Sequence, residues 1–156
     1  MPRQLRPVGP DFVESAPVRL VYEREVSASP EAVFHALAED VPGWPEWFSA
    51  VTLARTSDNG GRREIRLRVG ARFEETVLTA RASEVYAYRV DTANVPGLWA
   101  LAEEWRLTPA GTGTRVRWTF AVDGNAPFRL VVRAARGGLG RAFRQAAVAL
   151  DRRLAR

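Results

Sequence analysis

The chain has 156 residues, 46% of them hydrophobic and 26% charged, values typical of one soluble globular domain. It has no cysteine and a single histidine, which excludes disulfides, a cysteine nucleophile and a metal site built on cysteines or on two histidines. The net charge is +5, and every basic residue is an arginine. Because these arginines are spread along the whole chain, the charge argues against a nucleic-acid partner, which needs basic and aromatic residues clustered together.

The first 17 residues contain four prolines and no clear periodicity, so we predict an N-terminal arm over residues 1–17. Apolar and charged residues then alternate over residues 18–26, the pattern of a half-buried strand. Ser29 followed by Pro30 is a typical helix start. The segment 42–48 holds two tryptophans and two prolines and predicts a second short helical turn.

The middle of the chain reads as a run of about six strands. Turn residues separate them, and the sequence Asp-Asn-Gly-Gly at 58–61 is a strong hairpin signal. Hairpin connections throughout predict an antiparallel sheet with one solvated face. The expected strands are 51–56, 65–69, 73–81, 85–90, 98–108 and 114–122.

Residues 126–154 predict a long C-terminal helix. Apolar residues, Val131 among them, recur in steps of three and four, and most arginines fall on the opposite face. Gly137, Gly138 and Gly140 interrupt this pattern, and each glycine costs about 1 kcal/mol relative to alanine. The glycines indicate either a kink or close backbone approach at a cavity entrance, or a break between two separate helices.

This order of elements, with three local segments, resembles the START-like superfamily (SRPBCC, or helix-grip fold), most closely its polyketide cyclase/dehydrase type. The segments are VSASPEAVF at 26–34, WPEWF at 44–48 and GTRVRW at 113–118. The resemblance covers roughly residues 18–153 and implies an α+β fold in which a curled antiparallel β-sheet wraps around the long C-terminal α-helix, over a deep apolar cavity. It also implies binding of lipids, sterols or polyketides, with cyclisation or dehydration in some members.

Glu103 is the one candidate catalytic residue. Its strand places Trp99, Leu101 and Trp105 on the same parity, so its carboxylate should lie on an aromatic face. A desolvated carboxylate there would have a raised pKa and could act as a general acid or base, or hold a ligand hydroxyl. The alternative is a structural role, for example an ion pair with Arg63.

The other candidate ligand-binding residues are aromatic or apolar and could equally pack the core. They are Trp47, Phe73, Tyr86, Tyr88, Trp99, Leu101, Trp105, Trp118 and Phe143. The parity of residues 73–78 leaves open which of Glu74 and Glu75 points inward. His35 falls on the polar side of its helix and is expected to be an exposed bystander.

The predicted function is therefore the binding of a hydrophobic small molecule, lipid or polyketide-like, between sheet and helix, without a cofactor or metal. One alternative is a cyclase or dehydratase that uses Glu103 with Tyr86 or Tyr88. Another is an interaction module that presents the arginine face of the long helix to a protein or an anionic surface. We expect a monomer or homodimer, and a cytoplasmic location, because no apolar run suits a membrane span or a signal peptide.

Overall fold

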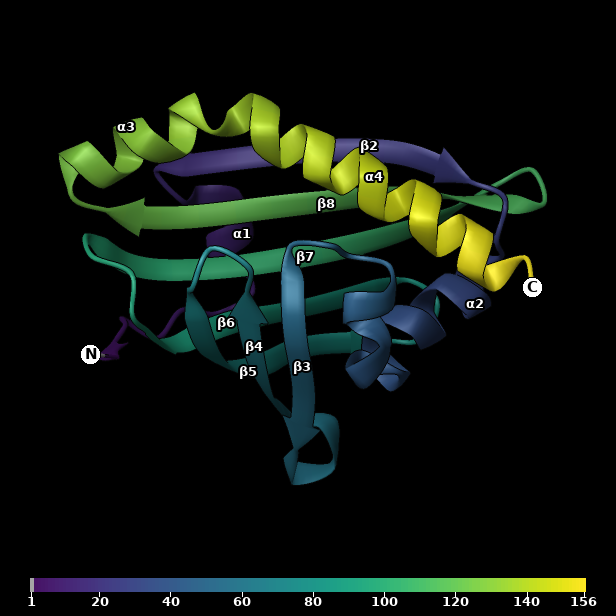
Figure 1. The fold of residues 1–156 in the computed structure, drawn as a ribbon, viewed down its shortest axis with the longest axis horizontal. Helices are drawn as coiled ribbons and strands as arrows, with labels where there is room; N and C mark the ends of the chain where they lie inside the picture. The colour runs from purple at the N-terminus through teal and green to yellow at the C-terminus, as the bar shows by residue number, and fades with distance from the viewer. Residues whose placement is uncertain (1) are drawn as a thin grey trace.

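The computed structural model describes residues 2–156 and shows one curled antiparallel sheet with two helices along its inner face (Figure 1). The strand order is β2-β8-β7-β6-β5-β4-β3, with β1 paired to β6. The strands are β1 (Arg3–Gln4), β2 (Val18–Val26), β3 (Val51–Ser57), β4 (Arg62–Leu67), β5 (Arg72–Arg81), β6 (Val85–Ala93), β7 (Leu98–Ala110) and β8 (Gly113–Gly124). The predicted α+β helix-grip architecture is confirmed.

The structure confirms two features that the local sequence predicts, a helix cap and a hairpin turn. The Ser29 hydroxyl accepts a hydrogen bond from the Ala32 N–H (3.2 Å) and caps α2 (Pro30–Phe34). The hairpin between β3 and β4 turns through η3 (Asp58–Gly60), where Asp58, Asn59 and Gly60 all have positive φ. Such backbone angles favour Asn and Gly, which explains why the sequence of this segment predicts a hairpin turn.

The segment after α2 buries two tryptophans beneath the sheet. It continues as a π-helical turn, η1 (His35–Glu39), and a 3-10 helix, η2 (Val41–Glu46). Trp44 and Trp47 are both buried, and the Trp44 Nε1 donates a hydrogen bond to the Leu37 carbonyl oxygen (2.9 Å). The proline-rich helical turn therefore anchors aromatic side chains in the core, as expected.

The long C-terminal helix is divided, contrary to a continuous helix over 126–154. The two parts are α3 (Ala126–Ala134) and α4 (Arg136–Leu154), and Ala135 between them has ψ of 0°. Gly137 and Gly138 are exposed, and a Cβ added to either would meet nothing within 4 Å. Both readings of the glycines thus hold in part, because the chain breaks just before them and only Gly140 makes a close approach.

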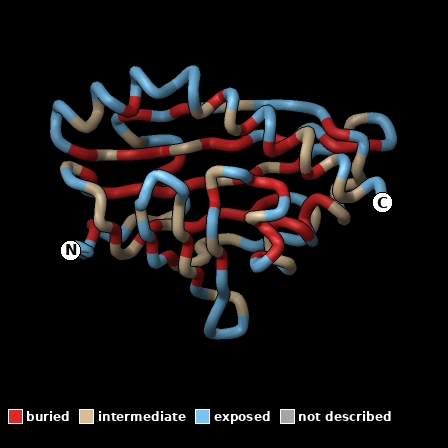
Figure 2. Tube along the Cα trace, viewed as in Figure 1, coloured by how far each residue is buried: buried red, intermediate tan, exposed pale blue. Residues whose placement is uncertain are grey.

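Tyr22 of β2 holds this junction. A Cβ added at Gly140 would lie 3.0 Å from its Cε1 atom, and the Tyr22 hydroxyl donates to the Arg136 carbonyl oxygen (2.7 Å). Val132 is buried, whereas Val131, predicted on the apolar stripe, is 66% exposed. Figure 2 shows α3 and the junction as mostly exposed. The helix arginines at 133, 136, 141 and 144 face solvent, as predicted.

The N-terminal arm is ordered and completes the sheet. Residues Arg3 and Gln4 pair with Ala93 and Thr92 of β6, and the Arg6 N–H donates to the Trp99 carbonyl oxygen (2.9 Å). The arm thus lies between the ends of β6 and β7, beyond the point where these two strands pair with each other.

The second half of the arm forms a short helix that covers the outer face of the sheet, which is the face opposite α4. The helix is α1 (Phe12–Ser15), and its buried Phe12 and Val13 pack against Ala100, Ala102 and Ala121. A larger core fills the inner face, beneath α4 (Figure 2). Within residues 2–156, no helix is long and apolar enough to cross a membrane.

Candidate ligand cavity

A cavity of about 160 Å³ lies on the inner face of the sheet, beneath the first half of α4. Its wall is apolar and largely aromatic, apart from three charged side chains. Its half-buried lining residues, which form its rim, are Ala50, Leu67 of β4, Phe120 of β8, and Leu139 and Ala142 of α4. The lining residues are Trp44, Phe48, Ala50, Val51, Arg63, Ile65, Leu67, Phe73, Glu75, Tyr88, Glu103, Trp118, Phe120, Leu139 and Ala142.

A buried ion pair forms one part of the polar end. Arg63 and Glu75 stand directly opposite each other on β4 and β5, and the Arg63 Nε lies 2.8 Å from the Glu75 Oε1. Their side chains are only 1% and 2% exposed, so neither charge is solvated by bulk water. Charges buried to this degree must be compensated by each other, which is what the pairing achieves.

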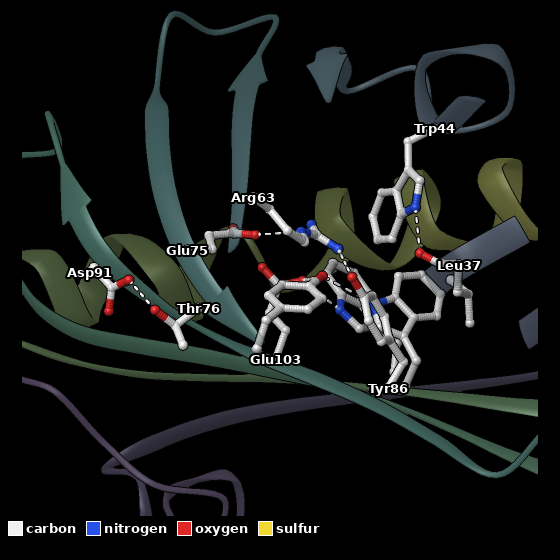
Figure 3. Close-up of polar contacts among 11 residues, drawn as sticks. Leu37, Trp44, Arg63, Glu75, Thr76, Tyr86, Asp91 and Glu103 are labelled. Carbon is white, nitrogen blue, oxygen red and sulfur yellow. Dashed lines mark hydrogen bonds and ion pairs between the residues drawn. The ribbon is translucent and has the colours of Figure 1, made fainter. Parts of the chain in front are cut away.

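Aromatic rings enclose the guanidinium of Arg63 (Figure 3). Its Cζ lies 3.9 Å from the ring centroid of Tyr88 and 4.6 Å from that of Trp44, distances suited to cation–π attraction. The Arg63 Nη1 also donates a hydrogen bond to the Tyr86 hydroxyl (3.2 Å). Arg63 is therefore fixed by ionic, aromatic and hydrogen-bond contacts at once.

The second carboxylate, Glu103 of β7, is held by one of its two oxygens. The Tyr88 hydroxyl (2.6 Å) and the Trp118 Nε1 (2.9 Å) both donate to its Oε1. The Trp105 Nε1 in turn donates to the Tyr88 oxygen (3.1 Å) and fixes that hydroxyl. In the described chain no hydrogen bond reaches Oε2 of Glu103, although this residue lines the cavity.

Burial shifts the ionisation of the whole cluster. It raises the pKa of Glu75 to about 7, with Arg63 opposing the rise and Glu103 adding to it. Burial also raises the pKa of Glu103, against the hydrogen bonds from Tyr88 and Trp118. The pKa of Tyr88 rises well above its usual value through burial and the adjacent Glu103 carboxylate. Burial lowers the pKa of Arg63, but Glu75, Tyr88 and Tyr86 together more than offset this and raise it.

The structure separates the predicted site residues into three groups. Four line the cavity, namely Phe73, Tyr88, Glu103 and Trp118. Five are buried in the surrounding core without bordering the cavity, namely Trp47, Tyr86, Leu101, Trp105 and Phe143. Trp99, the last of them, points out of the core.

The placement of Trp99 on the aromatic face is wrong. The pairing of β7 with β8 shifts register between Leu98 and Ala100, and Trp99 is the extra residue of this bulge. It is 47% exposed, whereas Leu101 beyond the bulge is buried in the inner core as expected. A bulge reverses the side-chain alternation, which simple parity counting cannot follow.

Arg63, Glu75 and Trp44 are cavity residues that were not among the predicted ligand-binding set. Arg63 partners Glu75, and not Glu103 as the structural alternative for Glu103 supposed. The parity of Arg63 with Ile65, and of Glu75 with Phe73, was the available signal for their inward orientation. The ion pair between Arg63 and Glu75 could be identified only if the register of β4 against β5 were known, because each strand by itself shows only one inward charged residue.

His35 is exposed, as predicted, and its Nδ1 lies 3.2 Å from Glu39 on the outside of the molecule. Across residues 2–156, no cluster of three histidine, cysteine or acidic side chains is arranged to hold a metal ion.

A curled sheet that encloses a cavity under a C-terminal helix defines the START-like class. A sequence model of the family described as polyketide cyclase/dehydrase and lipid transport matches residues 17–155, and the chain belongs to this family. Family and fold are consistent with ligand binding or with cyclase-like chemistry.

Individual relatives agree with this assignment. An uncharacterised protein of Mycobacterium tuberculosis is 28% identical over 127 residues, which cover 78% of this chain and 75% of the relative. An aromatase/cyclase from Streptomyces has a similar structure (TM-score 0.72, 17% identity, 89% of this chain and 94% of that one). A START superfamily protein from Mycobacterium smegmatis is also similar (TM-score 0.68, 14% identity, 87% and 96%). At such identities the two structures support the fold alone.

Proposed function

We propose that this protein binds a hydrophobic small molecule in the cavity beneath α4. The observation that carries the proposal is an unfilled, largely aromatic space of about 160 Å³ inside an otherwise packed core. Protein interiors are close-packed, and an apolar void loses dispersion contacts that a ligand restores. Ligand sites typically combine such a wall with a few polar groups, here Arg63, Glu75 and Glu103.

Native mass spectrometry of the purified protein, followed by organic extraction, tests this proposal. A discrete apolar compound at one copy per chain, or saturable uptake of added toluene, is the expected result. The variant Ala142→Leu places a larger side chain at the rim and should reduce toluene uptake, while Ala134→Leu, on an exposed position of α3, should not. A protein without bound compound that also takes up no toluene would refute the proposal.

A second candidate, an enzyme of the cyclase or dehydratase type, is favoured by one contact. The Tyr88 hydroxyl and the Glu103 carboxylate form a 2.6 Å hydrogen bond at the cavity wall, an arrangement suited to passing a proton to or from a bound molecule. If the extracted compound is turned over, Glu103→Gln should abolish turnover and retain binding. A carrier would show binding in both proteins and turnover in neither.

A further inference from the structure

The size of the cavity restricts what the proposed binding site can hold. An engineered protein cavity of about 150 Å³ accommodates benzene. At about 160 Å³, the present cavity has room for one ring with a small substituent. A fused polycycle or a long acyl chain would have to displace residues of the half-buried rim, such as Leu67, Phe120 or Leu139.

The positive charge in the cavity is already in use. The Nε of Arg63 lies against Glu75, its Nη1 donates to Tyr86, and the Tyr88 and Trp44 rings enclose its guanidinium. An anionic ligand would have to replace the Glu75 carboxylate, which stands 2.8 Å away on the opposite strand position. Arg63 is thus poorly placed to recognise a carboxylate, despite lining the cavity.

The polar groups of the cavity wall that remain for a ligand are hydrogen-bond acceptors. Glu75 and Glu103 outnumber Arg63 by two to one among the charged lining residues. The Oε1 of Glu103 already accepts two hydrogen bonds, whereas its Oε2 accepts none from the described residues. The Oε1 of Glu75 is committed to the ion pair with the Arg63 Nε (2.8 Å), which leaves the Oε2 of Glu103 as the acceptor that a ligand could reach. A carboxylate oxygen in such a position is normally satisfied by a donor.

We infer that the ligand of this cavity is a compact, single-ring molecule whose head group donates a hydrogen bond to Glu103, as a hydroxyl or an ammonium does, and that carboxylates are rejected. The inference rests on the proposed function and sharpens it to a class of ligand. The apolar ring would lie against the aromatic wall, and the donor would reach the Oε2 of Glu103 beside the fixed Tyr88 hydroxyl.

A series of ligands that share one ring tests the inference on the unchanged protein. Toluene, phenol, benzylamine, acetophenone and benzoate are titrated by calorimetry at neutral pH. One satisfied hydrogen bond is worth roughly a factor of ten in affinity, so phenol or benzylamine should bind about tenfold tighter than toluene. Benzoate should not bind measurably. The comparison of phenol with benzylamine shows which of the two donors is preferred.

Each other result has a definite meaning. Equal affinity for toluene, phenol and benzylamine would overturn the head-group inference and leave the binding function standing. Tightest binding of benzoate would assign anion recognition to Arg63, and tightest binding of acetophenone would show that Glu103 donates a proton; either overturns the inference. Failure of all five ligands would overturn the single-ring inference, and only together with the absence of any extracted compound would it refute the proposed function.

Two matched variants locate the effect. Glu103→Gln should remove the roughly tenfold preference for the donor over toluene, while toluene still binds. Glu104→Gln is the control, because Glu104 is the next residue on β7 and pairs with Arg106 instead of lining the cavity. An unchanged preference in Glu103→Gln would overturn the role of Glu103.

Discussion

The two faces of the sheet are packed by opposite means. On the outer face, Ala100, Ala102 and Ala121 are completely buried, and α1 closes the surface above them with Phe12 and Val13. On the inner face, large rings and three charged side chains face α4, and about 160 Å³ stays open. Small side chains let a helix settle directly on the strands, whereas rigid rings and fixed ion pairs leave gaps where their shapes do not interlock.

A single strand serves both faces. β7 turns Ala100 and Ala102 outward, and Leu101, Glu103 and Trp105 inward, with strict alternation beyond the bulge. The closed outer face and the open cavity are therefore encoded in the two alternating sets of side chains of one strand. The following changes test how far the two faces differ.

The largest effect is expected from Arg63→Met. The substitution leaves Glu75 buried without a cation and should lower the free energy of unfolding by about 3–5 kcal/mol, measured by urea denaturation. The control is Arg62→Met, because Arg62 is about half exposed and makes only long ionic contacts, to Asp58 (4.0 Å) and Asp91 (3.9 Å). The double variant Arg63→Met/Glu75→Leu should regain most of the loss. A double variant as unstable as Arg63→Met would show that the charge imbalance is not the cause.

The inner face should also make stability depend on pH. Glu75 has a pKa of about 7 in the folded protein against an ordinary value of 4.5. The folded state therefore binds a proton that the unfolded chain has lost, so stability is full below about pH 4.5 and falls as pH rises through about 7. The expected loss between about pH 5 and pH 8 is up to about 3 kcal/mol, by urea denaturation.

Glu75→Gln should flatten this dependence, and Glu74→Gln, on the exposed side of β5, should leave it intact. Asp151 acts in the opposite direction at lower pH. Burial raises the pKa of Asp151, but hydrogen bonds from Ser27 and Ala28 lower it by more. The stabilisation that Asp151 gives the folded state is therefore lost only as pH falls below the usual aspartate range. A profile that is flat or rises from pH 5 to pH 8 would contradict the inward, protonatable state of Glu75.

The same substitution on the two faces should have different costs. Ala102→Leu overpacks the closed outer face and should destabilise the protein by about 1–3 kcal/mol. Ala142→Leu extends into the cavity and should change stability by less than about 0.5 kcal/mol. Thermal unfolding of both variants measures the difference. Equal costs would mean that the inner face is as tightly packed as the outer one.

A local effect, at the low end of that expected for Ala102→Leu, is expected at the helix junction above the cavity. Tyr22→Phe removes the hydrogen bond to the Arg136 carbonyl oxygen and should cost about 1 kcal/mol. The ring keeps its contacts with Trp118 and Phe143, so the loss should be local. Faster amide exchange at Gly138 and Gly140 without a change elsewhere is the expected signature, and a uniform acceleration across the sheet would contradict it.

The fold could be predicted because its signals are local. Alternation marked β2, the Ser29-Pro30 pair marked the start of α2, and the Asp-Asn-Gly-Gly turn marked the β3–β4 hairpin. Each of these features depends on a few neighbouring residues, whose conformational preferences can be read from the sequence without knowledge of the tertiary structure.

The site was predicted less completely because it depends on register and on packing. The pairing of Arg63 with Glu75 follows from the alignment of β4 with β5, which no single strand contains. The bulge that exposes Trp99 is likewise a property of two strands. The helix divides at Ala135, a good helix former, just ahead of Gly137 and Gly138, so the glycines indicated a possible break but did not mark the residue at which it occurs.

The position of the N-terminal arm sets an order on the folding of the chain. Arg3 and Gln4 add to an edge of β6 at Ala93 and Thr92, and the Arg6 N–H donates to the Trp99 carbonyl oxygen, so the place they occupy exists only once β6 and β7 have formed. Contacts of such sequence separation are slow to form because the closure of a long loop must be paid for first. Until the arm arrives, the edges of β6 and β7 that face it have no partner there, although the other edges of these strands pair with β5 and β8.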